Sequence, residues 1–138
     1  MTTDLDWLTE LRAHVLRADL ERLGRFDPVR VRQRMRDGFR PEHTRIIVVD
    51  GKDVGSISVR KDPDARWIEH FYIEPEVQHR GIGTRVLALV LAEDDPHPHR
   101  LNVLQGSPAR RLYERHGFTL DAEDDVDVWM TRQPQGLA

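Results

Sequence analysis

The 138-residue sequence contains no cysteine and no long apolar stretch. The absence of cysteine excludes a disulfide framework, a thiolate zinc site and a cysteine nucleophile. A membrane-spanning helix needs roughly 20 mostly apolar residues, and no stretch approaches that length. The first residues also lack the basic and apolar regions of a signal peptide. We therefore expect a cytoplasmic protein without a membrane partner.

Lysine is scarce, since only Lys52 and Lys61 occur and arginine supplies the remaining positive charge. The sequence has 21 Lys and Arg residues and 24 Asp and Glu residues, which gives a formal net charge of −3. General affinity for nucleic acid needs a clustered excess of positive charge. Every second residue over 30–36 is arginine, which suits either a nucleic-acid contact helix or a solvated helix face. We favour the solvated face and expect no nucleic-acid partner.

The length suits a single domain, because a chain of this size buries about two thirds of its unfolded surface. We expect one domain over residues 1–132, followed by a flexible tail at 133–138. Two helices are predicted first. Apolar residues recur at three- and four-residue spacing from Asp4 to Leu23. The second helix begins at Asp27 and Pro28, a capping residue and a proline suited to the first helical turn, and ends at Gly38.

Short β-branched runs then alternate with helical patterns. They predict strands at 44–50, 54–60, 66–73, 100–104, 118–121 and 126–131, and helices at 85–93 and 107–117. The order α-α-β-β-β-α-β-α-β-β indicates an α/β (α+β) fold. The predicted sheet is mixed, mostly antiparallel and twisted, with about six strands flanked by helices on both faces. His97 and His99 are predicted to lie in a solvated loop, and no metal site is expected because further ligands are lacking.

A glycine-rich turn lies between the strand ending at Ile73 and the next helix. Gly81 and Gly83 would let a ligand approach the backbone N–H groups. The helix N-terminus adds unsatisfied donors and a positive dipole end, which favours a bound phosphate. A plain strand-to-helix turn is the alternative. The dinucleotide fingerprint needs glycine where Val86 stands, and the NTP-binding loop needs lysine directly before Thr84, so both motifs are excluded.

Two motifs resemble those of the GNAT acetyltransferase superfamily. The first is similar to that family's Gln/Arg-x-x-Gly-x-Gly/Ala and reads Gln78-His79-Arg80-Gly81-Ile82-Gly83-Thr84. The second, from Ser107 to Phe118, resembles the family's Asn-x-x-Ala-x-x-x-Tyr-x-x-x-Gly-Phe. The resemblance covers about Thr44 to Arg132 and implies a GNAT-like sheet.

The resemblance implies acetyl-CoA as the co-substrate. Its pyrophosphate would lie on the N–H groups of His79 to Thr84, and its pantetheine arm would follow the strand that ends at Ile73. Ser107 stands where many relatives carry asparagine, so that contact is either lost or supplied by the serine hydroxyl. The expected cofactor-binding residues are Phe71, Ile73, Gln78, His79, Arg80, Gly81, Ile82, Gly83, Thr84 and Ser107.

Two residues are expected to carry the chemistry. Glu69 is the first candidate for the general base, since the family often places a base at this strand position; a structural salt bridge is the alternative. His70 or a water molecule could serve instead. Tyr113 matches the family's tyrosine that protonates the departing CoA thiolate, or else it is a core aromatic residue.

The implied activity is N-acetyl transfer to a primary amine of a small molecule or peptide. The alternative is a non-catalytic acyl-CoA-binding or interaction module with the same fold. The acidic segment 123–127 either attracts a cationic amine or forms a solvated turn. The family's usual N-terminal strand is not predicted, and an exposed sheet edge covered by a second copy gives the hypothesis of a homodimer.

Overall fold

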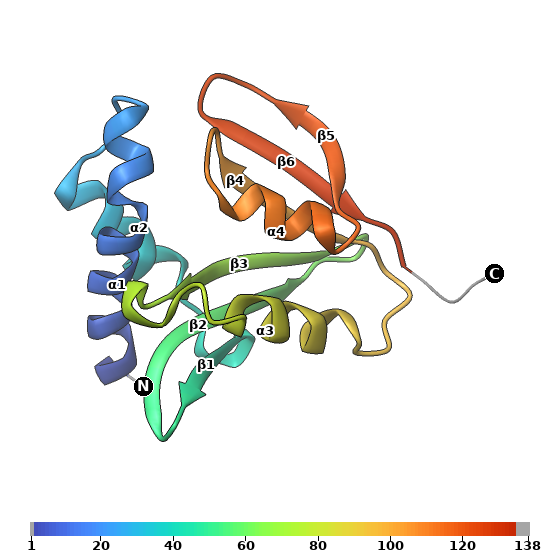
Figure 1. Ribbon diagram of the computed structural model, residues 1–138, viewed down its shortest axis with the longest axis horizontal. Coiled ribbons are helices and arrows are strands. Elements are labelled where there is room, and N and C mark those ends of the chain that lie inside the picture. Colours follow the sequence, from blue (N-terminus) through green and yellow to red (C-terminus); the bar gives the residue numbers. More distant parts are fainter. Residues whose placement is uncertain (1, 135–138) are drawn as a thin grey trace. The chain divides into compact units, whose positions relative to one another are not determined.

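The computed structural model describes residues 2–134. Within them the chain forms four α-helices and six β-strands, joined in part by two short 3-10 helices (Figure 1). The helices are α1 Thr2–Arg22, α2 Pro28–Gly38, α3 Ile82–Leu91 and α4 Ala109–Arg115. The strands are β1 Thr44–Val49, β2 Lys52–Lys61, β3 Arg66–Ile73, β4 His99–Leu104, β5 Thr119–Glu123 and β6 Asp127–Arg132. The predicted element order is confirmed.

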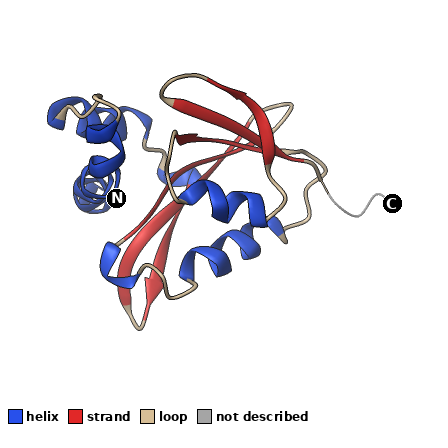
Figure 2. Ribbon diagram, turned by 45° about the horizontal axis from the view of Figure 1, so that its top comes forward, coloured by secondary structure: helices blue, strands red, loops and turns tan. Residues whose placement is uncertain are grey.

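The strands, drawn in red in Figure 2, form one open sheet whose order is β1-β2-β3-β4-β6-β5. The pairs β1–β2, β4–β6 and β5–β6 are antiparallel, whereas β3 and β4 are parallel. The parallel ladder found in residues 2–134 joins Arg66 to His99 and Trp67 to Arg100, at the beginning of each strand. The prediction of a mixed, mostly antiparallel sheet of about six strands is therefore confirmed.

The chain divides into two compact units. The first unit comprises Met1–Ser58 and His70–Gln78, and the second comprises Val59–Glu69 and His79–Ala138. Strands β2 and β3 contribute to both units. The single domain over 1–132 stays a prediction, and most of the predicted tail lies outside the described residues.

In the first unit, α1 and α2 share a buried apolar cluster with β3. Its members are Leu8, Leu11, Met35, Phe39 and Tyr72. Burying one such side chain stabilises the fold by about 1.5–3 kcal/mol. The carboxylate of Asp27 caps α2 as predicted, because it accepts hydrogen bonds from the backbone N–H groups of Val29 and Arg30, each at 3.0 Å.

Gly55 of β2 is required by close packing against β3. A Cβ atom at this position would lie 2.1 Å from the carbonyl oxygen of Tyr72, closer than any real contact. The backbone N–H of Glu74 also donates a 2.7 Å hydrogen bond to the carbonyl of Val54. This approach keeps the end of β3 in register with β2 in the first unit.

In the second unit, apolar residues alternate along β4 and β6 as expected for strands with one buried face. Leu101, Val128 and Met130 are almost completely buried. Leu87 and Val90 form the buried stripe of α3.

Two expectations about loops of the second unit were wrong. His99 is not in a solvated loop; it is the first residue of β4 and is buried. Burial lowers the pKa of His99 below its ordinary value. Strand β5 also continues to Glu123, through residues that were predicted to form an acidic turn. The pairing of Glu123 with Val128 extends the strand, a contact that local composition does not encode.

An ion-pair cluster supports the start of β4. Asp95 accepts hydrogen bonds from Arg66 Nε at 2.7 Å and from His97 Nδ1 at 2.8 Å. Burial raises the pKa of Asp95, but hydrogen bonds from the backbone and ring of His97 and from Arg66 outweigh burial and hold that pKa well below its usual range.

Candidate functional site

The turn after β3 is braced by its own side chains in the first unit. Pro75–Val77 forms a 3-10 helix, and the side-chain amide of Gln78 donates a 2.8 Å hydrogen bond to the carbonyl of Ile73. Gln78 thus ties the beginning of the glycine turn to the end of the strand. Phe71 and Ile73, the other predicted cofactor contacts in this unit, are both half-buried.

The N-terminus of α3 in the second unit has no side-chain cap. Gly81 is the N-cap residue with φ +78°, and no side chain from it or its neighbours bonds the first N–H groups. Apart from Gly81 and its two chain neighbours, no described residue has an atom within 4 Å of a Cβ built at Gly81. His79 also has a left-handed backbone, with φ +65°. N–H groups without a side-chain cap at a helix N-terminus, with no acidic residue in the first turn, suit a bound anion.

The second predicted motif contains α4. The hydroxyl of Ser107 accepts a 3.2 Å hydrogen bond from the backbone N–H of Ala109. The N-cap residue of α4 is Pro108, however, and no side chain caps the helix. Tyr113 is 8 % exposed, and its ring packs edge-on against Phe118 with centroids 5.7 Å apart. The ring of Tyr113 is therefore a core aromatic group, as one of the two alternatives predicted. The role of its hydroxyl as a general acid stays a prediction.

Glu69 lies in an ion-pair group of the second unit. Arg60 Nε donates a 3.0 Å hydrogen bond to Glu69, and the same guanidinium contacts Asp62 and lies 5.7 Å from the Trp67 ring centroid. Burial lowers the pKa of Arg60, but hydrogen bonds to Glu69 and Asp62 outweigh burial and raise it above the ordinary value. The salt bridge left open by the sequence is present, and the base role of Glu69 stays a prediction.

The arginine-rich α2 and the acidic segment after β5 have local partners. Arg32 pairs with Glu10 at 2.8 Å and Arg36 with Asp6 at 3.5 Å, all with exposed side chains. Asp124 accepts hydrogen bonds from the backbone N–H groups of residues 126 and 127. These contacts agree with a solvated helix face and a solvated turn.

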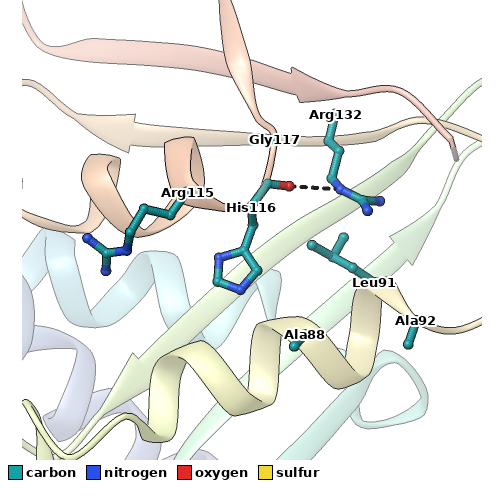
Figure 3. Close-up of a pocket in the computed structure, with 7 residues that line it drawn as sticks. All are labelled: Ala88, Leu91, Ala92, Arg115, His116, Gly117 and Arg132. Carbon is teal, nitrogen blue, oxygen red and sulfur yellow. Dashed lines mark hydrogen bonds between the residues drawn. The ribbon is translucent and has the colours of Figure 1, made fainter.

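A pocket of about 520 Å³ lies between the last turns of α3 and α4 in the second unit (Figure 3). Arg132 borders it and donates a 2.8 Å hydrogen bond from Nε to the carbonyl of His116. The lining residues are Ala88, Leu91, Ala92, Arg115, His116, Gly117 and Arg132. Ala88 lies six residues beyond the start of α3, roughly 9 Å along the axis at 1.5 Å per residue, so this pocket is separate from the glycine turn.

The structure adds residues that the sequence did not single out. In the first unit, Ser56 and Arg12 belong to a hydrogen-bonded group around His70 and Tyr72. No signal in the linear sequence marks this group, because its members are far apart in the chain. Within residues 2–134 there is no group of three His, Asp or Glu side chains suited to a metal ion. None of the helices described there is both long and apolar enough to cross a membrane.

The fold agrees with the comparisons to known proteins. The model of a family described as "Acetyltransferase (GNAT) domain" matches residues 41–120, more than half of the chain. The chain therefore belongs to the GNAT acetyltransferase family, a family of acyltransferases. No curated protein matches the chain by sequence.

Solved structures share this fold at low sequence identity. PaiA N-acetyltransferase from Thermoplasma acidophilum, in complex with coenzyme A, is 19% identical with a TM-score of 0.73, covering 95% of this chain and 93% of that one. PH1933 from Pyrococcus horikoshii OT3 is 23% identical with a TM-score of 0.74, covering 96% and 91%. An N-acetyltransferase from Staphylococcus aureus Mu50 is 16% identical with a TM-score of 0.70, covering 95% and 96%. At sequence identities this low, the similarity shows a shared fold only.

Proposed function

We propose that this protein transfers an acetyl group from acetyl-CoA to a primary amine of a small molecule or peptide. The observation that carries the proposal is the uncapped N-terminus of α3, where Gly81 leaves open space beside the first helical N–H groups. Membership in the GNAT family and the coenzyme A bound to the Thermoplasma relative support an acyl-CoA donor.

The donor site follows from this turn. The pyrophosphate of acetyl-CoA would accept hydrogen bonds from the backbone N–H groups over 79–84, helped by the positive end of the α3 dipole. The pantetheine arm would run along the backbone of Phe71 and Ile73, and the hydroxyl of Ser107 would take the place of the usual asparagine. Arg80, Ile82, Gly83 and Thr84 complete the proposed cofactor contacts.

The chemistry is direct attack of the amine nitrogen on the thioester carbonyl carbon. A new C–N bond forms, the C–S bond breaks, and the CoA thiolate takes up a proton. An alkylamine has a pKa of about 10, so removing its proton at pH 7 costs about 4 kcal/mol. We assign this task to Glu69, directly or through water, and protonation of the thiolate to Tyr113, since a phenol still carries its proton at neutral pH.

We also propose the class of acceptor, the cellular compartment and the oligomeric state. The acceptor is an amine-bearing small molecule or peptide, the reaction is cytoplasmic, and a homodimer would cover an exposed sheet edge. Strand β1 ends the described sheet on one side and carries the exposed Val48. Light scattering at micromolar concentration tests the dimer, and a monomer there would remove it.

Two measurements test the function. A thermal melt with acetyl-CoA at 100 times its Kd should show about 2.7 kcal/mol of added stability. A thiol-release assay with a panel of amines should then detect turnover. Binding without turnover on any amine would favour the non-catalytic acyl-CoA-binding module, and absence of stabilisation at millimolar acetyl-CoA would reject both.

A further inference from the structure

His70 has a backbone conformation that strands do not use. Its φ is +48°, in the left-handed region, although it lies inside β3 and is not a glycine. Residues with a Cβ are disfavoured there, because the Cβ comes too close to the following carbonyl oxygen. Such residues persist only where their surroundings enforce the conformation, and they concentrate at functional sites.

One hydrogen bond is made directly to the backbone of His70. The hydroxyl of Ser56, which is fully buried at 0 % exposure, donates a 2.7 Å hydrogen bond to the His70 carbonyl oxygen. His70 is half-buried. Leaving its carbonyl and the buried Ser56 hydroxyl unpaired would be costly, so the bond favours the one backbone path that brings the carbonyl to Ser56.

Further contacts hold the ring of His70. Its Nδ1 atom lies 3.4 Å from the hydroxyl of Tyr72, and Arg12 Nε donates a 3.0 Å hydrogen bond to that same hydroxyl. Arg12 also bonds the carbonyl of Val31, so the chain of contacts links α1, α2 and β3.

The end of α2 provides the room that the ring needs. A Cβ at Gly38 would lie 3.1 Å from the Nε2 atom of His70, which is tighter than normal packing. Glycine at this position therefore lets the imidazole lie against the helix. Backbone, ring and packing contacts, all within the first unit, converge on this one strained residue.

We propose that His70 is a positioning residue, held left-handed by a clamp of Ser56, Tyr72, Arg12 and Gly38, for the strand segment that receives acetyl-CoA. A left-handed residue inside a strand redirects the peptide groups that follow it, as in β-bulges beside active sites. The segment that follows is Phe71–Ile73, to which the proposed function assigns the pantetheine arm. The inference rests on that function and adds residues that touch neither substrate.

Ser56→Ala tests the clamp against a matched control, Ser58→Ala. Ser58 lies on the same strand, is 4 % exposed and bonds the hydroxyl of Thr44 at 2.8 Å instead of His70. Ser56→Ala should raise the KM for acetyl-CoA by about 10–100-fold while the KM for the amine stays unchanged. Ser58→Ala should leave both KM values unchanged. Equal effects of the two variants on the KM for acetyl-CoA would overturn the proposal.

A pair of substitutions at His70 separates backbone conformation from lost side-chain contacts. Glycine adopts φ +48° freely, whereas alanine does not. His70→Gly should therefore bind acetyl-CoA with a Kd near the wild-type value, and His70→Ala should bind about tenfold more weakly. Equal Kd values for the two variants would mean that the left-handed backbone has no positioning role.

The backbone can also be followed without any turnover. In the wild-type protein and in Ser58→Ala, the Cα and Cβ chemical shifts of residue 70 should have values typical of a left-handed backbone. In Ser56→Ala they should move toward values typical of a β-strand. Unchanged shifts in Ser56→Ala would reject the clamp even if acetyl transfer is observed. Absence of acetyl-CoA binding by the wild-type protein would instead reject the proposed function, and the shifts would still decide whether the clamp exists.

Discussion

Arg60 and Glu69 are joined by a 3.0 Å hydrogen bond from Nε to the carboxylate, at the strand position proposed for the general base. The Glu69 side chain is 38 % exposed, so it is open to water while it is paired. Asp62 binds the same guanidinium, which therefore has two carboxylate partners. Glu69 could be released to take a proton from the amine without leaving Arg60 unpaired.

Glu69→Gln should lower kcat by about 10²–10⁴-fold if Glu69 is the base, because glutamine cannot accept the proton. Its effect on stability should be about 1 kcal/mol, since a partly exposed ion pair contributes little. Asp62→Asn is the control, as it removes the other carboxylate from Arg60. A thiol-release assay measures kcat for both, and equal values would remove the base role from Glu69.

Tyr113→Phe should lower kcat by about 10²–10⁴-fold, because the departing thiolate would lose its proton donor. The ring would still pack against Phe118, so the free energy of unfolding should fall by only about 1 kcal/mol. Single-turnover kinetics and a denaturant melt measure the two quantities. A full kcat in Tyr113→Phe would leave this tyrosine with a packing role alone.

Gly81→Trp should abolish acetyl-CoA binding, since the indole would occupy the open space beside the α3 N-terminus. The left-handed backbone should add a cost of about 1–2 kcal/mol in stability. Gly24→Trp is a matched control, because Gly24 has φ +70° and equally open surroundings at the end of α1. Calorimetric titration with acetyl-CoA distinguishes them, and the anion site is wrong if both variants bind normally.

Asp95→Asn should lower the free energy of unfolding at pH 7 by about 1–3 kcal/mol, because Arg66 and His97 would lose a charged acceptor. The pKa of Asp95 is depressed in the folded protein, so its stabilisation is complete above the ordinary value of 3.8 and is lost as pH falls below that value. The difference from wild type should therefore shrink in acid. Denaturant melts across pH measure it, with the neighbouring Asp94→Asn as a control that should show no difference.

Elements with strong local signals were predicted well. The cap at Asp27, followed by Pro28, marks the beginning of α2 because capping depends on neighbours two or three residues away. The glycine turn before α3 was also recognised, but α3 begins at Ile82, three residues before the predicted start at residue 85, and only the structure shows the left-handed conformation of Gly81. The environments of His99 and Glu123 were missed because they depend on strand pairing with distant residues.

Local sequence patterns were enough to predict the glycine turn, the order of strands and helices and the family, because capping, periodicity and motif spacing act over a few residues. The folded chain was needed to see that Arg60 pairs with Glu69, that Tyr113 is buried against Phe118, and that Ser56 bonds the carbonyl of His70. The residues in these contacts are not neighbours in the sequence and are brought together by sheet pairing and packing. The contacts stabilise the protein only after the loops between those residues have closed, so local sequence patterns do not reveal them.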